Sequence, residues 1–526
     1  MFDILPTGID GLDAILGGGI RYPEDTAAFV FVTGETGTGK TLLGLELLTR
    51  AWWRDDRGGR TFLFYSIEQS PQDLHKKLIY DFGHYFGAPG EVRIANGENP
   101  AKMCLEIDAP SGGTNQLVIT HANPANSDVR GFKIDIDWIQ AEIGNYGRAD
   151  EVGMVCIDNV GLLLSDLDYF DKRAALLSAR NHLMRHRVHG IFLHEESGPK
   201  SPHFPSAEEL STDVLVHLAF HDSALFKSRS IEILKARHQY YYRGAHHFSI
   251  AGKGVNRELY LGARSERGPG THVYPSIAAQ LSIARDESQL RVPRRGETVI
   301  SLGPPQIATA FRGSTGPTKL SSTIVLAEPG TRYTGFALSF LARGVETDEV
   351  GLLVSTKEDE DAILRICRNR DYLSALVSAD RKSISKQVRL LYLHPEFLSA
   401  GKFTSDIMRM CEAGPDADTD PGISRLAFDN VYQLHRRFPL LHGQEFLIAA
   451  LLDLLRYRKI TPLFIDHVPQ GSARGDLGMD PSLHLSTFDN VLHLFVKQDE
   501  GEHRPYARIL KSVGNEFDSR PFPVAL

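Results

Sequence analysis

Short apolar runs alternate with amphipathic stretches through the first half of the chain. Apolar residues recur at helical spacing in Thr41–Arg54 and Tyr169–His186. Four runs around these stretches are rich in β-branched and aromatic side chains, as is typical of strands buried on both faces of a parallel sheet: Ala27–Gly34, Thr61–Glu68, Gly153–Asn159 and Gly190–Glu195. The alternation predicts an α/β fold, with a mostly parallel sheet flanked by helices.

The second half of the chain repeats this plan. A helical pattern spans Gln444–Lys459. CIDNVGLL from Cys156 and AFDNVYQL from Ala427 are near-copies, as are EILKARH near Glu232 and RILKSVG near Arg508. The strand-like runs of this half are Ser321–Glu328, Val350–Glu358, Arg425–Asn430, Thr461–Asp466 and Asn490–Val496. A long internal repeat of one α/β domain is the simplest interpretation.

The region between the two copies sets the expected domain boundaries. Period-two alternation over Arg229–Ile250 predicts a hairpin that ends the first domain. Residues 263–295 are rich in Arg, Gly, Pro and Ser, which indicates a linker with one short helix at Ser276–Ala284. The expected domains are therefore residues 1–262 and 296–526.

The first domain also contains an expected insertion at about residues 95–133. Two strand-like runs, Lys102–Ala109 and Asn115–Ala122, are joined through Ser-Gly-Gly-Thr and predict a hairpin. Such a hairpin could bind a protein partner, or it could only cover an edge of the sheet. The sequence leaves both alternatives open.

Composition excludes several classes of protein. The 526 residues include 58 Lys and Arg against 66 Asp and Glu, a net charge of −8, whereas proteins that grip nucleic-acid backbones carry a basic excess. The four cysteines are scattered, which fits a reducing compartment and neither a disulfide framework nor a zinc site. No run approaches the length of a membrane span, and no secretion signal opens the chain. We expect a cytoplasmic protein without membrane or nucleic-acid partners.

One motif in the first half points to phosphate chemistry. Gly34-Glu-Thr-Gly-Thr-Gly-Lys-Thr41 matches G-x-x-x-x-G-K-[ST] between an expected strand and an expected helix. In such a loop the lysine reaches the β- and γ-phosphates, and the last hydroxyl can bind Mg²⁺. We therefore expect ATP and Mg²⁺ here. The nucleotide-binding residues would be Gly34, Thr36, Gly37, Thr38, Gly39, Lys40 and Thr41.

Two acidic residues close expected strands near this loop. Asp158 ends GMVCID and could bind the metal together with Thr41. Glu68 ends TFLFYSIE and could orient or deprotonate an attacking water, or contribute to the metal site. Lys40, Asp158 and Glu68 are thus candidate catalytic residues. The alternatives are a turn residue for Asp158 and a helix-entry charge for Glu68.

The first half resembles a KaiC domain of the RecA-like P-loop ATPase superfamily. Thr7–Gly19 is similar to the family's N-terminal signature, and Asp158 matches its Walker B aspartate. Glu68 matches the first of two catalytic glutamates, whereas the second position holds Gln69. Since known KaiC proteins are tandem duplications, the resemblance covers both halves and implies two tandem RecA-like domains, each with a C-terminal β-hairpin.

The resemblance also implies assembly. Arg229–Arg237 is similar to a strand that faces the nucleotide of the neighbouring subunit in this family. Arg229, Lys235 and Arg237 are therefore expected to contact a neighbour's nucleotide, with Arg229 also a candidate catalytic cation. A complete site would need two subunits, so we expect a homohexameric ring with two tiers.

The second half departs from the family at its chemical positions. The expected P-loop is Ala327-Glu-Pro-Gly-Thr-Arg-Tyr-Thr334, in which Arg332 and Tyr333 replace the glycine and the lysine. The glutamate pair becomes Lys357-Glu358, although Asp429 remains at the Walker B position. These changes predict a pseudo-ATPase domain that transmits assembly state or docks a partner. Whether it binds nucleotide stays open.

The kinase activity of the family's second domain is not expected here. Ser486-Thr487-Phe-Asp489 loosely resembles the segment that KaiC phosphorylates, but the same half lacks a competent P-loop. Three functions remain: a ring that hydrolyses ATP slowly, a nucleic-acid motor or recombinase on the same core, and a nucleotide-gated scaffold with negligible turnover. The loops that would form a motor's channel, residues 197–209 and 470–480, are not basic, which favours the first or the third.

Overall fold

The chain forms two compact units. One comprises the described residues up to 251 together with 270–279, and the other comprises those from residue 280 onward. The computed structural model describes residues 1–9, 11–78, 92–95, 102–121, 151–164, 167–196, 211–222, 227–251, 270–287, 298–393, 399–413, 421–437, 441, 446–468, 486–499 and 502–526.

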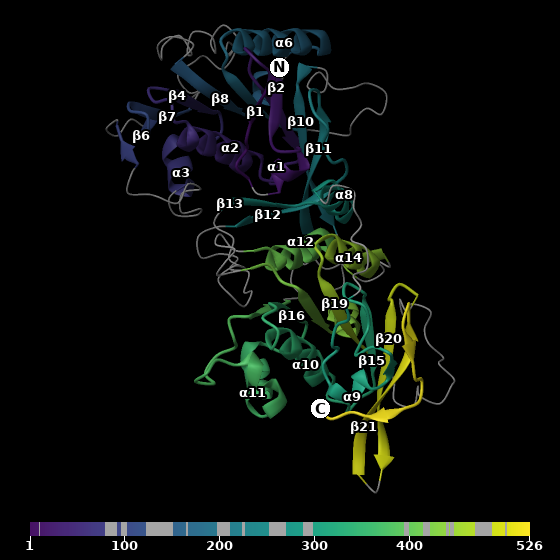
Figure 1. Cartoon of the computed structure of the whole chain (residues 1–526). Coiled ribbons are helices and arrows are strands. Elements are labelled where there is room, and N and C mark those ends of the chain that lie inside the picture. Colours follow the sequence, from purple (N-terminus) through teal and green to yellow (C-terminus); the bar gives the residue numbers. More distant parts are fainter. Residues whose placement is uncertain are drawn as a thin grey trace. The chain divides into compact units, whose positions relative to one another are not determined.

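The described residues of the first unit form an eleven-stranded sheet ordered β13-β12-β11-β10-β3-β9-β8-β4-β7-β6-β5 (Figure 1). Its parallel centre comprises β10 (Val214–Asp222), β3 (Phe29–Gly34), β9 (His189–Glu195), β8 (Val152–Asp158), β4 (Thr61–Ser66) and β7 (Thr114–His121). Antiparallel strands flank it, namely β11 (Lys227–Ala236), β12 (His246–Ala251), β13 (Gly270–Tyr274), β6 (Lys102–Asp108) and β5 (Arg93–Ile94). The predicted mostly parallel sheet is confirmed.

Helices cover both faces of this sheet because successive strand residues point to opposite sides. Val32 packs into one core with Trp52 of α2 (Lys40–Arg54). Its neighbour Phe31 packs into the other core with Leu183 of α6 (Tyr169–Arg185). The smaller elements of this unit are β1 (Phe2–Leu5), α1 (Leu12–Ile15), β2 (Ile20–Pro23), α3 (Pro71–Lys76) and α5 (Val160–Leu163).

The second unit has an eight-stranded sheet among its described residues, ordered β17-β16-β18-β19-β15-β20-β21-β23. These strands are β17 (Val388–Tyr392), β16 (Gly351–Ser355), β18 (Arg425–Asp429), β19 (Thr461–His467), β15 (Thr323–Ala327), β20 (Asn490–Asp499), β21 (Glu502–Ser512) and β23 (Phe522–Pro523). Its first seven strands match β7-β4-β8-β9-β3-β10-β11 of the first unit in order. The predicted internal repeat is therefore confirmed.

The other elements of the second unit surround this sheet. The strands β14 (Phe311–Arg312) and β22 (Glu516–Phe517) pair with each other. The helices are α9 (Pro305–Ala308), α10 (Tyr333–Val345), α11 (Glu360–Arg368), the 3₁₀ helix η5 (Asp371–Leu376), α12 (Ala400–Cys411), α13 (Val431–Arg437) and α14 (Phe446–Tyr457). In the part of the chain that the structure describes, no helix combines the length and apolarity needed to cross a bilayer.

The expected linker contains regular structure. Its described residues form β13, the edge strand beyond β12, and α8 (Ile277–Glu287). The strand is held by contacts distant in sequence: the backbone N of Thr271 donates to the buried carboxylate of Glu46 at 2.7 Å. A Cβ at Gly11 would lie only 1.9 Å from the Val273 carbonyl oxygen. Local periodicity could not reveal a strand that depends on these tertiary contacts.

The expected insertion is a hairpin of β6 and β7. However, β7 pairs in parallel with β4, just as β17 pairs in parallel with β16 in the second unit. The strand β7 is therefore common to both units. On this side of the sheet, the strands without a counterpart in the second unit are therefore β5 and β6, which continue the sheet beyond β7. This supports the edge-covering alternative, and a partner on the hairpin stays a prediction.

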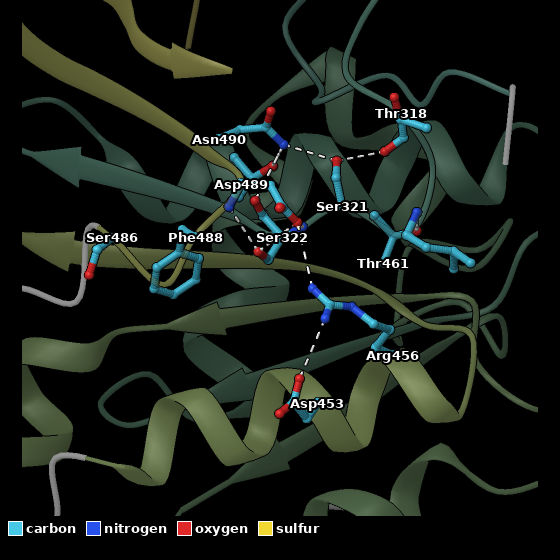
Figure 2. Close-up of polar contacts among 12 residues, drawn as sticks. Thr318, Ser321, Ser322, Asp453, Arg456, Thr461, Ser486, Phe488, Asp489 and Asn490 are labelled. Carbon is cyan, nitrogen blue, oxygen red and sulfur yellow. Dashed lines mark hydrogen bonds and ion pairs between the residues drawn. The ribbon is translucent and has the colours of Figure 1, made fainter. Parts of the chain in front are cut away.

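Figure 2 shows a polar network at the start of β20 in the second unit. The buried carboxylate of Asp489 accepts hydrogen bonds from the backbone N and hydroxyl of Ser322, at 3.0 and 3.2 Å. Asn490 Nδ2 donates to the Ser322 carbonyl at 3.3 Å, and the Arg456 guanidinium lies 3.9 Å from Asp489. These contacts tie β20 to the segment before β15. Ser486 lies exposed just before them.

Candidate functional site

The loop between β3 and α2 depends on its glycines. Gly34 has φ 153° and Gly39 has φ 109°. A Cβ at Gly34 would lie 2.2 Å from the Leu218 carbonyl oxygen, and one at Gly39 would lie 2.6 Å from Ile250 Cδ1. At Gly34 the backbone of β10 leaves no space for a side chain, whereas at Gly39 it is mainly the positive φ that favours glycine. The helix begins at Lys40, one residue before the helical pattern of the sequence.

Lys40 lies folded over this loop. Its side chain is 8% exposed, and Nζ donates to the carbonyl oxygens of Gly34 and Glu35 at 2.9 and 2.8 Å. Burial lowers the pKa of the ammonium, whereas nearby carboxylates raise it, with Glu195 first and Asp158 next. The lysine is thus a buried cation among acidic groups at the carboxyl edge of the parallel strands.

Asp158 and Thr41 meet beside the loop, as predicted. Asp158 ends β8 and is 8% exposed, and burial together with the nearby Glu68 raises its pKa to about 6. The Thr41 hydroxyl hydrogen-bonds to this carboxyl and opposes that rise. A carboxylate and a hydroxyl oxygen are ligands that Mg²⁺ accepts when phosphates complete its coordination. These two residues therefore fit a nucleotide-bound Mg²⁺.

Glu68 lies just past the end of β4, with its side chain exposed. The backbone N of Ile67 donates to the Asp158 carbonyl at 2.7 Å, which keeps the two strand ends together. The charge of Glu68 acts on both Lys40 and Asp158. Gln69 instead accepts a hydrogen bond from Lys77 at 2.6 Å. The exposed carboxylate therefore suits a role toward water better than a fixed place among metal ligands.

Glu195 belongs to this cluster, and sequence reasoning missed it as a site residue. It ends β9, which lies next to β3, and its carboxylate accepts a hydrogen bond from the Thr36 hydroxyl. The sequence did contain a signal for Glu195 as a site residue, because the carboxyl ends of neighbouring parallel strands meet at one edge of a sheet and ligands bind there. Glu195 closes one of the predicted strands.

The three basic residues expected on β11 lie at two different ends of that strand. Arg229 pairs with Phe220, and its guanidinium lies 5.5 Å from that ring. A Cβ at Gly37 would lie 4.0 Å from the same ring, so Arg229 is near the loop of its own chain.

Lys235 and Arg237 are placed at the opposite end. Lys235 pairs with Leu215, which pairs with Phe31, three residues and about 10 Å before Gly34. Arg237 lies further on and approaches Asp213 at 3.7 Å. The structure thus brings Arg229 to the candidate site and leaves the other two away from the loop of their own chain.

The second unit keeps the loop's backbone and changes its chemistry. Gly330 has φ 86°, close to Gly37 at 81°, and Arg332 has φ 56° where the first unit has Gly39. Arg332 thus adopts the left-handed conformation despite its side chain, at a cost of about 1–2 kcal/mol.

An aromatic pair occupies the positions of Lys40 and Glu195. Tyr333 begins α10, and its ring lies 4.4 Å from that of His467, which ends β19. Burial raises the pKa of the Tyr333 hydroxyl far above its usual range, so it stays neutral. Asp429 accepts a hydrogen bond from Thr334 at 2.8 Å, as a copy of the Asp158 and Thr41 pair. The second unit therefore keeps the carboxyl group and the hydroxyl of this site and lacks its lysine.

Comparison with known proteins agrees with this geometry. A family model described as "ATPase: KaiC" matches residues 5–90, which include the loop and Glu68. The circadian clock oscillator protein KaiC of Picosynechococcus sp. is 25% identical over 97% of this chain and 86% of its own length. The circadian clock protein KaiC3 of Synechocystis sp. is 23% identical over 98% of this chain and 88% of its own. Two sheets of one strand order, a P-loop in the first unit and these similarities are together consistent with a KaiC-like protein of the RecA-like P-loop ATPase superfamily.

Proposed function

We propose that the first unit binds ATP with Mg²⁺ and hydrolyses it slowly to ADP and phosphate. The observation that carries this proposal is the convergence of Lys40, Thr41, Asp158 and Glu68 at one edge of the sheet. A phosphate loop alone would support binding only. The added carboxylates supply a place for the metal and a base for water.

Each residue has a distinct role in this proposal. Lys40 offsets the charge of the β- and γ-phosphates, which requires it to leave the carbonyl oxygens that it contacts. Thr41 and Asp158 would hold Mg²⁺, which supplies charge neutralisation at the phosphates when bound. Glu68 orients the attacking water and accepts its proton as the bond to the γ-phosphorus forms and the bond to ADP breaks.

We propose that the second unit does not hydrolyse ATP. Tyr333 cannot neutralise phosphate charge, and Lys357 stands at the position of Glu68, because Thr356 N donates to Asp429 O as Ile67 N does to Asp158 O. This unit would serve assembly or regulation, and it would have no kinase activity.

We further propose self-association into a homohexameric ring in the cytoplasm. Lys235 and Arg237 lie at the end of β11 that is remote from their own loop, so they could complete the site of a neighbouring copy. The candidate channel loops of a nucleic-acid motor, residues 197–209 and 470–480, lie outside the described residues. The net negative charge of the chain does not favour that alternative.

Steady-state ATPase and nucleotide binding of three proteins test the proposal. Wild type should hydrolyse ATP in a Mg²⁺-dependent manner, Glu68→Gln should bind nucleotide and lose turnover, and Lys40→Ala should lose both. Full turnover in Glu68→Gln would refute the role of Glu68. Turnover that appears only with single-stranded DNA would instead support the motor, and binding without any turnover in wild type would support the gated scaffold.

A further inference from the structure

Glu195 contacts the phosphate loop from the neighbouring strand. Its half-buried carboxylate accepts a hydrogen bond from the hydroxyl of Thr36, a residue of the loop. Its backbone N donates to Asn159 Oδ1 at 3.3 Å, directly after Asp158. The residue is thus attached on both sides to elements of the candidate site, although it is neither the expected base nor an expected metal ligand.

The same carboxylate acts on Lys40. Among the acidic groups that favour the charged form of this lysine, Glu195 has the largest effect, ahead of Asp158 and Glu68, and Glu196 has the smallest of the four. Glu195 therefore provides the leading negative charge beside the ammonium that would neutralise phosphate.

The second unit provides an internal comparison. Glu195 pairs with Gly34 across the sheet, and His467 pairs with Ala327 in the same register. Where Lys40 is replaced by Tyr333, Glu195 is replaced by His467, and the two rings contact each other. The two positions thus change together, from a cation with an anion to two aromatic rings. The second unit thus lacks both charged residues at the two positions where the first unit has both.

We propose that Glu195 is a positioning residue that limits the affinity of the first unit for nucleotide. This inference rests on the proposed ATP site. The carboxylate holds Thr36 and attracts Lys40, and it repels the phosphates that need both. Binding of nucleotide must therefore overcome one negative charge at the edge of the loop. Neutralising this charge should tighten the binding of nucleotide. A merely structural role of Glu195 predicts weaker or unchanged binding instead.

The test is equilibrium binding of a fluorescent, non-hydrolysable ATP analogue with Mg²⁺ to the full chain. Glu195→Gln should tighten binding about tenfold, the order expected for removing one charge a few ångströms from the phosphates in a partly exposed site. Glu195→Ala, which cannot accept a hydrogen bond, should also tighten binding. In steady-state kinetics both should lower KM more than they change kcat.

Glu196→Gln is the matched control, because it makes the same change in charge one residue along. Glu196 lies 3.3 Å from His217 and has the weakest effect on Lys40. It should therefore tighten binding less than Glu195→Gln does. Unchanged or weaker binding in Glu195→Gln, or an equal gain in Glu196→Gln, would overturn the inference. Absence of binding to wild type would refute the proposed ATP site itself, so the two failures are distinguishable.

Discussion

The ring of Tyr333 lies edge-on against the ring of His467, with centroids 4.4 Å apart and planes at 81°. The corresponding positions of the first unit hold Lys40 and Glu195, on the same two elements of the same sheet order. The matched positions therefore carry a lysine with a glutamate in one copy and an aromatic pair in the other. Aromatic contact stabilises the second loop and cannot replace a cation toward phosphate.

Of the matched residues Lys40 and Tyr333, only Lys40 should matter for ATP turnover. We expect Lys40→Met to reduce ATP turnover at least a hundredfold, since it removes a cation that offsets transition-state charge. Tyr333→Phe keeps the ring contact and should leave turnover within about twofold of wild type. Steady-state ATPase of the full chain measures both. A large loss in Tyr333→Phe with Lys40→Met still active would reverse the roles of the two units.

Gly34 should tolerate no side chain. In Gly34→Ala the new Cβ would lie 2.2 Å from the Leu218 carbonyl oxygen, so β3 and β10 must move apart. We expect a loss of about 3 kcal/mol or more in the free energy of unfolding, the upper range for overpacking. Gly59→Ala is the control, because Gly59 has φ 72° with no atom within 4 Å of the new Cβ, and it should cost only about 1 kcal/mol. Equal losses in chemical denaturation would contradict the steric argument.

Asp158 should destabilise the protein in the absence of Mg²⁺ and nucleotide. Its pKa is raised from 3.8 to about 6 on folding, so the folded state disfavours the ionised form. Below pH 3.8 the carboxyl is protonated in both states and the penalty is absent. It develops as the pH rises from about 3.8 to about 6, and it stays at about 3 kcal/mol at neutral pH.

Asp158→Asn, which cannot ionise, should therefore increase the free energy of unfolding at pH 7.5 by up to about 3 kcal/mol and abolish Mg²⁺-dependent turnover. The stability gain should vanish below pH 4. Urea denaturation at both pH values, with EDTA present, measures the difference. A destabilised Asp158→Asn at pH 7.5 would show that the carboxylate has a structural partner instead.

Lys235 and Arg237 should contribute to the nucleotide site of a neighbouring copy of the chain. Lys40→Ala subunits and Lys235→Ala/Arg237→Ala subunits should each be inactive alone. Mixed rings should recover activity, because about one interface in four would join an intact loop to an intact β11 in a random assembly. The check is ATPase after mixing and reassembly. If mixtures stay inactive while Lys235→Ala/Arg237→Ala alone keeps wild-type turnover, these residues are not part of the site.

The sequence predicted those parts of the fold that depend on local pattern. Continuous apolar runs such as Thr61–Glu68 identified the parallel strands, and the glycine spacing with Lys40 identified the loop. β13 was missed because its place depends on Glu46, which is 225 residues away from its partner Thr271 in the chain. Glu195 was missed because its role follows from the neighbouring strand and not from its own surroundings in sequence. That Arg229 and Arg237 lie at opposite ends of β11 follows only from the register of β10 and β11, which the sequence does not show.

The most direct test is the number and place of nucleotides bound per chain. We would determine a structure of the purified protein with Mg²⁺ and a non-hydrolysable ATP analogue, and measure bound nucleotide by native mass spectrometry. We expect one nucleotide per chain, with its phosphates beside Lys40 and the metal on Thr41 and Asp158. Phosphates beside Tyr333, with the loop at Lys40 empty, would contradict it.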